Sequence, residues 1–176
     1  MSTTSSTSSV RTIVIPLVAG AAVAVALGVY ARVHEPTGVA INIAGFSSFQ
    51  AVKAWLATLA ALLGVVQLIS AAALYRGAKV GPLHRWSGRA AVAVSLPVVA
   101  HCLYALGFEY GEPRVLIHSL LGCFFYGAFV VKMLTLTRKD APRWLLPVAG
   151  GAVFTALIGV WLTSALWFFT TFGIKR

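Results

Sequence analysis

The amino-acid sequence predicts an all-α integral membrane protein with five transmembrane helices. Of its 176 residues, 59% are hydrophobic and only 10% are charged, a balance that soluble domains of this size do not show. Five apolar segments are long enough to cross about 30 Å of hydrocarbon as helices. None of them has the alternating pattern of a lipid-facing barrel strand. The expected spans are Thr12–Ala31, Phe49–Tyr75, Ser87–Phe108, Arg114–Thr137 and Trp144–Phe172.

The first span follows a polar stretch. Residues 1–10 are almost entirely Ser and Thr, so we expect them to form a disordered tail. A single five-helix domain over residues 11–176 follows. A signal peptide is the alternative interpretation of the first apolar segment, because Arg11 precedes a run that contains small residues. Its apolar core is longer than the usual hydrophobic region of a signal peptide, which favours a retained span.

The Lys and Arg residues between the spans predict the orientation, because cytoplasmic loops retain more positive charge than outer loops. With the amino terminus inside, nine of the 14 cations are cytoplasmic, and we expect a cell-membrane protein with its carboxyl terminus outside. The net charge of +10 then reflects contact with lipid headgroups and not with nucleic acid. The cytoplasmic set is Arg11, Arg76, Lys79, Arg85, Arg89, Lys132, Arg138, Lys139 and Arg143, and the outer set is Arg32, Lys53, Arg114, Lys175 and Arg176.

Two histidines lie inside the third and fourth spans, on either side of a short turn at Glu109–Pro113. His101 is about two helical turns before it and His118 about one turn after it, so both side chains fall at nearly the same depth. Imidazole is an axial ligand of haem iron, and ionisable residues inside spans are usually functional. We therefore predict a helix bundle that holds one haem b between His101 and His118, near the outer face. A hydrogen-bonded pair that joins the helices and a different metal are the alternatives.

Three neighbours of the histidines are candidate cofactor-binding residues. Arg114, one turn outward from His118, is expected to contact a haem propionate. Gly122, one turn deeper, would leave room for the porphyrin. Pro97, one turn before His101, is expected to kink the third span and widen the pocket. Snorkelling of the arginine and the ordinary frequency of glycine in membrane helices are the alternatives.

The sequence contains no recognisable catalytic motif. An acid–base pair, a nucleophile triad, a phosphate loop and a dehydrogenase fingerprint are all missing. Cys102 and Cys123 form no C-x-x-C-H motif, so a haem would be held by coordination alone. We interpret both cysteines as small buried apolar residues.

A second polar cluster, His84-Arg85-Trp86-Ser87-Gly88-Arg89, begins the third span on the expected cytoplasmic side. Hydrogen-bond donors beside an indole suit a quinone carbonyl or a lipid phosphate. His84, Arg85 and Ser87 are the candidate contacts, and Gln67 of the second span is expected to face them. The alternatives are interfacial anchoring by Trp and Arg and a second haem at His84.

Histidines at equal depth, preceded by an H-R-W-x-G-R element, resemble the cytochrome b561 and ferric-reductase-like membrane haem proteins, over residues 83–134. Such families usually hold two haems, with a second ligand on each helix toward the other face. The corresponding positions here are Ser87 and Lys132, which are not usual haem ligands, so one haem is expected. His84-Arg85-Trp86-Ser87-Gly88 is also similar to the H-R-x-S-G opening of the cytochrome b anchor subunit of succinate dehydrogenase. That similarity implies a quinone site at Arg85 and Ser87.

Together these features predict a membrane b-type cytochrome that transfers electrons. Quinol is the candidate donor, and the acceptor would be an extracytoplasmic molecule or a membrane partner subunit. The alternative is a non-redox accessory or assembly subunit of a membrane complex, in which the histidines only join helices. No helix face stands out as an oligomer interface, so no oligomeric state is predicted.

Overall fold

Helices are the only regular secondary structure in residues 4–39 and 46–174, which are the residues that the computed structural model describes. The helices are α1 (Thr4–Val33), α2 (Phe49–Tyr75), α3 (Gly81–His101), η1 (Cys102–Leu106), α4 (Pro113–Leu136), α5 (Leu145–Trp161), η2 (Leu162–Leu166) and α6 (Trp167–Phe172). Two of them, η1 and η2, are π-helical turns that continue α3 and α5 without a break. The predicted fold class is confirmed.

Five segments of the described chain are long and apolar enough to cross a membrane, which confirms a multi-pass membrane protein. The third begins at Gly81, well before the expected Ser87, because Pro82 occupies the first helical turn. Proline is favoured there, since the N–H that it lacks would have no partner in the helix. The segments are Val10–Val33, Phe49–Tyr75, Gly81–Leu106, Pro113–Leu136 and Leu145–Phe172.

The amino-terminal boundary also differs from expectation. Residues 4–10, which we expected to be disordered, continue α1 as its first turns. Once an apolar span has nucleated a helix, each further residue adds a hydrogen bond at little cost, so a polar extension can stay helical. Residues 1–3 of the expected tail lie outside the described residues.

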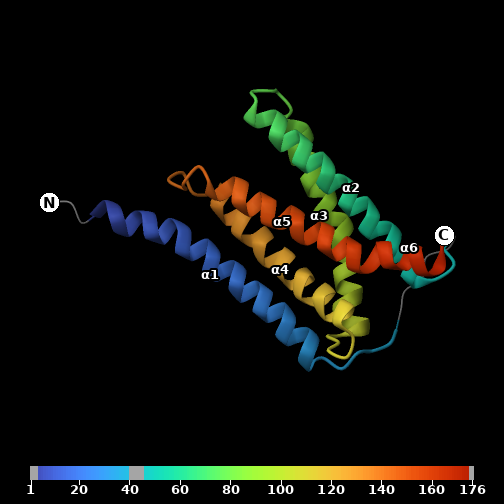
Figure 1. The fold of residues 1–176 in the computed structure, drawn as a ribbon. Helices are drawn as coiled ribbons and strands as arrows, with labels where there is room; N and C mark the ends of the chain where they lie inside the picture. Colours follow the sequence, from blue (N-terminus) through green and yellow to red (C-terminus); the bar gives the residue numbers. More distant parts are fainter. Residues whose placement is uncertain (1–3, 40–45, 175–176) are drawn as a thin grey trace.

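The chain passes up and down through the bundle (Figure 1). The beginning of α1, the α2–α3 turn and the α4–α5 turn lie at one end of the bundle. The end of α1, the beginning of α2, the η1–α4 link and α6 lie at the other. His118, in the second turn of α4, and His101, at the end of α3, both belong to this second end.

The order in which the helices pack differs from their order in the chain. Helix α1 packs on α4, α4 on α5, α5 on α2, and α2 on α3, while η1 returns to contact α1. Consecutive helices are usually neighbours, yet α3 and α4 do not pack along their lengths. A hydrogen bond of 2.9 Å between Ser95 and Tyr126 joins them across the intervening space. That space is where the candidate site lies.

Small residues let the other helices approach closely. Most of the buried hydrophobic residues are alanines. The tightest contact joins α1 to α4, where a Cβ atom added to Gly20 would lie 2.5 Å from the carbonyl oxygen of Gly127, and one added to Gly127 would lie 2.7 Å from that of Gly20. Small residues at such crossings are typical of helices that associate within a bilayer.

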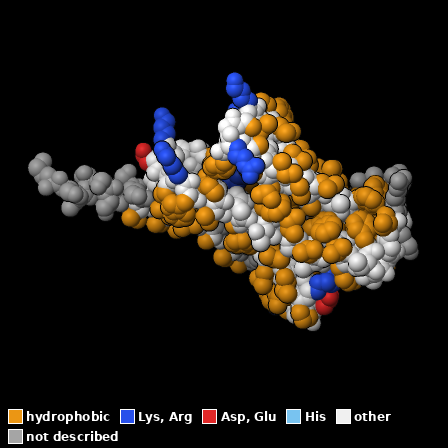
Figure 2. Space-filling view, turned by 45° about the horizontal axis from the view of Figure 1, so that its top comes forward, with side chains coloured by type: hydrophobic (Ala, Val, Ile, Leu, Met, Phe, Trp, Pro, Cys, Tyr) orange, Lys and Arg blue, Asp and Glu red, His pale blue; other side chains and the backbone are white. Residues whose placement is uncertain are grey.

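Large hydrophobic side chains face outward instead. Val18, Val25, Leu62 and Ile69 are each more than half exposed, although soluble proteins bury such residues. Figure 2 shows hydrophobic side chains over most of the visible face, with Lys and Arg gathered mainly toward one end. A surface of this composition is suited to lipid, so the predicted contact with membrane lipid is supported.

Candidate functional site

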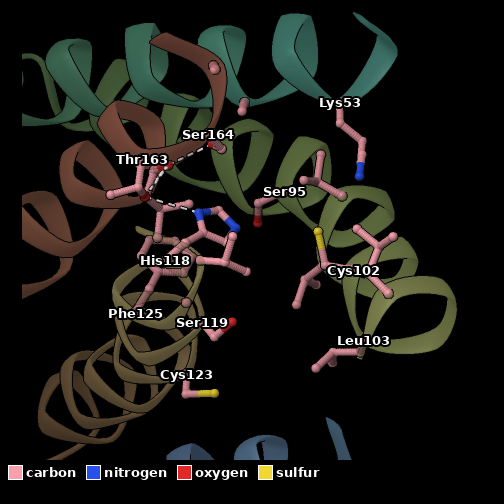
Figure 3. Close-up of a pocket in the computed structure, with 18 of the residues that line it drawn as sticks. Lys53, Ser95, Cys102, Leu103, His118, Ser119, Cys123, Phe125, Thr163 and Ser164 are labelled. Atoms are coloured by element: carbon pink, nitrogen blue, oxygen red, sulfur yellow. Dashed lines mark hydrogen bonds between the residues drawn. The ribbon is translucent and has the colours of Figure 1, made fainter. Parts of the chain in front are cut away.

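A cavity of about 350 Å³ has α3 and η1 on one side and α1 and α4 on the other. Residues of α2, α5, η2 and α6 complete its walls. Most of its lining is aliphatic or aromatic, and a smaller number of polar groups converge on it (Figure 3). This combination is typical of a ligand site. The polar and ionisable side chains that line it are Gln50, Lys53, Ser95, Cys102, Arg114, His118, Ser119, Cys123, Tyr126, Thr163 and Ser164.

His118 lines this cavity, and its ring is held by Thr163. Nδ1 of His118 lies 3.1 Å from Oγ1 of Thr163. That hydroxyl donates its own proton to the carbonyl oxygens of Gly159 and Val160, at 2.8 and 3.1 Å. When the hydroxyl donates to either carbonyl, it accepts from Nδ1–H of the histidine, and this tautomer leaves the lone pair of the ring on Nε2. Figure 3 shows the second ring nitrogen directed into the hollow.

Both π-helical turns contribute to the cavity wall. Cys102, Leu103 and Leu106 of η1 line one side, and Thr163 and Ser164 of η2 line the other. A π-turn widens the helix and changes which side chains face inward, and such turns occur frequently at functional sites. The turn in η2 holds Thr163 at the position where its hydroxyl reaches His118.

His101 does not line the cavity with His118. Its ring instead packs against Phe49 of α2, with ring centroids 5.5 Å apart. Its Nε2 atom is buried and has no hydrogen-bond partner in the described part of the chain, and buried polar atoms of this kind call for an explanation such as a missing ligand. The structure thus places both histidines at the same end of the bundle but does not bring their rings together, and bis-histidine ligation stays a prediction.

The structure separates the two residues that were expected to make room for a porphyrin. Gly122 lines the cavity, and a Cβ atom added there would meet no other atom within 4 Å. Pro97 lies inside α3 but is exposed and does not line the cavity. Only the glycine therefore borders open space on the side of His118.

Arg114 lines the cavity with its charge already paired. Its guanidinium binds both carboxylate oxygens of Glu112, at 2.9 and 3.0 Å, and donates to the carbonyl oxygen of Thr163 at 2.8 Å. It also lies over the ring of Trp167, 3.8 Å from the ring centroid. These contacts fix α4 to η2 and α6, and they use most of the arginine's donors. The expected contact with a propionate stays a prediction.

The polar residues at the other end of the bundle join α2 to α3. Nε2 of Gln67 donates to the backbone carbonyl of His84 and, at 2.7 Å, to Oγ of Ser87, so Gln67 faces this cluster as predicted. Oγ of Ser70 lies 2.9 Å from Nδ1 of His84, and Oγ of Ser87 also donates to the carbonyl of Leu83 at 2.7 Å. These groups satisfy one another, as expected of a polar contact between membrane helices.

The remaining residues of that cluster face outward or serve packing. Arg85 is exposed, and the guanidinium of Arg89 lies 5.0 Å from the ring centroid of Trp86, which is also exposed. Gly88 allows Gln67 to approach, because a Cβ atom there would lie 2.9 Å from Oε1 of Gln67. The geometry suits interfacial anchoring and helix packing, and the quinone site and the second haem stay predictions.

The remaining histidine and the cysteines do not build a metal cluster. His34 follows α1, and its Nε2 lies 3.2 Å from the carbonyl oxygen of Tyr104 in η1. Cys102 and Cys123 are free thiols that both line the cavity. In residues 4–39 and 46–174, no group of three or more His, Cys, Asp or Glu side chains is arranged to hold a metal ion. A haem, which needs one or two axial ligands, is not excluded by this finding.

Thr163 and Lys53 are site residues that the sequence analysis missed. Thr163 lies about a turn before Trp167 in an apolar span, and nothing in that pattern distinguishes a hydroxyl that bonds its own helix from one that orients a histidine. Lys53 was counted only as a charge near the outer boundary. The signal that could have identified Lys53 was its position one helical turn inside a span, where charged residues are usually functional.

Comparisons with known proteins add a family but no activity. No curated protein and no solved structure matches the chain. The resemblance to cytochrome b561 and ferric reductases is not tested by these comparisons. Residues 13–176, which include all but the first residues of the first span, the other four spans and every residue of the cavity, match a family model described as "Family of unknown function (DUF6529)". The chain belongs to this family.

Proposed function

We propose that the protein is a membrane b-type cytochrome in which His118 is an axial ligand of one haem. The observation that carries this proposal is the orientation of the His118 ring. Its Nδ1 lies 3.1 Å from the hydroxyl of Thr163, and its Nε2 is directed into a mainly apolar cavity. Histidines that bind metals almost always donate their other ring N–H to a neighbouring group in this way.

His101 is the proposed second ligand. It lies at the same end of the bundle, and its buried Nε2 has no partner among the described residues. Its neighbour Cys102 lines the cavity, and adjacent helical residues point about 100° apart. Ligation by His101 therefore requires the end of α3 to turn about its axis. The π-turn η1, which directly follows His101, is a place where such a change of phase can be absorbed.

Haem would supply one-electron chemistry, and the chain would supply its surroundings. Thr163 orients the imidazole of His118. The aliphatic walls keep water away, and Gly122 leaves open space beside the ring. We further propose quinol as the electron donor and an extracytoplasmic acceptor or partner subunit, which agrees with the position of the cavity in one half of the bundle.

A non-redox accessory subunit is the second candidate function. Side-chain hydrogen bonds already join the helices, among them those of His118 with Thr163, Ser95 with Tyr126, and Gln67 with Ser87. Polar contacts of this kind stabilise helix association by themselves. In this case the histidines would hold helices and bind no cofactor.

The absorption spectrum of the purified protein separates the two functions. From haem-replete cells, we expect about one b-type haem per chain, and a reduced-minus-oxidised spectrum of the six-coordinate low-spin form, because two imidazoles fill both axial positions. The haem-to-protein ratio should be measured by pyridine haemochrome. A colourless protein would contradict the cytochrome proposal and favour the accessory subunit.

The proposed orientation places the amino terminus in the cytoplasm and the cavity in the outer half of the membrane. The α2–α3 and α4–α5 turns and their flanks carry Arg76, Lys79, Arg138, Lys139 and Arg143, and such turns tend to stay inside. Reporters fused after Thr137 should therefore report the cytoplasm, and reporters fused after Gly111 the outside. The reverse pattern would assign the redox partner to the cytoplasm.

A further inference from the structure

Lys53 is a cation within the wall of the apolar cavity. It lies in the second turn of α2, is half-buried, and lines the cavity that His118 also lines. Figure 3 shows its side chain extending from α2 toward Cys102, across the hollow from His118. The ammonium group is thus presented to the same space as the imidazole.

No carboxylate of the described chain balances this charge. The ion pair between Arg114 and Glu112 is the one found among residues 4–39 and 46–174. The ammonium of Lys53 has a different neighbour, the ring of Phe49, whose centroid is 5.2 Å away. An unpaired cation in apolar surroundings is unfavourable and attracts an anion. All four acidic residues lie outside the helices, at Glu35, Glu109, Glu112 and Asp140.

Arg114 is a poorer partner for an anionic ligand than Lys53. Its charge is compensated by a two-point contact with Glu112, and a third donor is used by the carbonyl oxygen of Thr163. An anion that entered the cavity would meet the negative charge of Glu112 beside Arg114. It would meet no such charge beside Lys53.

We propose that Lys53 binds a carboxylate of the porphyrin whose iron His118 holds. A porphyrin carries its propionates on one edge, so the cavity must offer a cation at a distance from the axial ligand. Lys53 and His118 approach the cavity from different helices, α2 and α4, and meet that requirement. This inference rests on the proposed function and replaces Arg114 by Lys53 as the propionate contact.

The test compares two porphyrins that differ only in their carboxylates. Apo-protein from haem-deficient cells, in detergent, is titrated with iron protoporphyrin IX and with its dimethyl ester, and each Kd is read from the Soret band. The Kd of the dimethyl ester divided by the Kd of the acid should fall about tenfold between the wild type and Lys53→Met, because a charge-assisted hydrogen bond is lost for the acid alone. Detergent partitioning of each porphyrin is the same for every variant and cancels in this comparison.

Matched variants separate the contact from general effects of charge. Lys132→Met removes a half-buried lysine of α4 that does not line the cavity, so the wild-type ratio should persist. Lys53→Arg keeps a cation and should keep the preference for the acid. Lys53→Gln, which keeps polarity without charge, replaces Lys53→Met if the latter does not fold, and should lower the ratio in the same way.

The outcomes distinguish the inference from the function on which it rests. Equal ratios for the wild type and both neutral Lys53 variants, with haem still bound, would overturn the role of Lys53 and leave the cytochrome proposal intact. In that case the side chain of Lys53 would extend to the outer membrane–water interface. Failure of the wild type to bind either porphyrin would overturn both.

Discussion

Replacing His118 with alanine should remove the haem from the purified protein. His118 is the histidine that lines the cavity, and the hydroxyl of Thr163 lies where it can accept the Nδ1 proton of the tautomer that ligation needs. Loss of an outer contact to a ligating histidine lowers metal affinity about 10- to 100-fold, and loss of the ligand itself should lower it at least as much. The haem-to-protein ratio of His118→Ala, measured by pyridine haemochrome, should be close to zero.

Other substitutions test which atoms carry this effect. His101→Ala should retain haem but convert the low-spin spectrum to a high-spin one, since one axial position would be empty. Thr163→Val is nearly isosteric and should keep the spectrum while weakening haem binding about tenfold, as expected for a positioning residue. His34→Ala is the control, because His34 lies outside the cavity and contacts the carbonyl of Tyr104. Full haem content with an unchanged spectrum in His118→Ala would exclude His118 as a ligand.

Replacing Gly127 with alanine should destabilise the bundle. The new Cβ atom would lie 2.7 Å from the carbonyl oxygen of Gly20 and 3.0 Å from Cβ of Ala24. The first of these is a backbone atom, so relief requires α1 to move away from α4, its principal packing partner. We expect a loss of about 1–3 kcal/mol, typical of overpacking. The measurement is the midpoint of unfolding in a detergent–SDS titration, followed by circular dichroism.

Gly151→Ala is the matched control for this substitution. Gly151 also lies inside a membrane helix, α5, and a Cβ atom there would meet nothing within 4 Å. Alanine favours the helix over glycine by about 1 kcal/mol, so this variant should unfold at the same or a higher SDS fraction. If Gly127→Ala were as stable as Gly151→Ala, the close approach of α1 and α4 would not hold in the folded protein.

The number and approximate positions of the spans followed from the sequence because each is a local property. A segment crosses hydrocarbon when its own length and apolar content allow it, and its backbone hydrogen bonds are satisfied within the helix. Boundaries were less certain where polar residues flank the apolar core, as at Gly81, where the helix extends through the residues around His84. The depth of His101 and His118 was equally local, because depth is counted along the helix axis.

The sequence also predicted that Gln67 faces His84 and Ser87. Few polar residues lie at that depth, and polar residues of neighbouring membrane helices tend to pair. Polar side chains inside apolar surroundings have few partners to choose from. The pairing of Arg114 with Glu112 was missed, although the two residues are only two positions apart. A turn at the start of a helix brings such side chains together in a way that helical spacing does not predict.

By itself the sequence determined an all-helical membrane protein with five spans and two histidines at similar depth. Only the tertiary structure decided that α3 and α4 stand apart around a cavity, that His118, Lys53 and Thr163 face it, and that His101 turns toward Phe49. The physical reason is that rotation about a helix axis depends on packing against all neighbours. A single π-turn, such as η1 or η2, shifts that rotation without leaving a recognisable mark in the sequence.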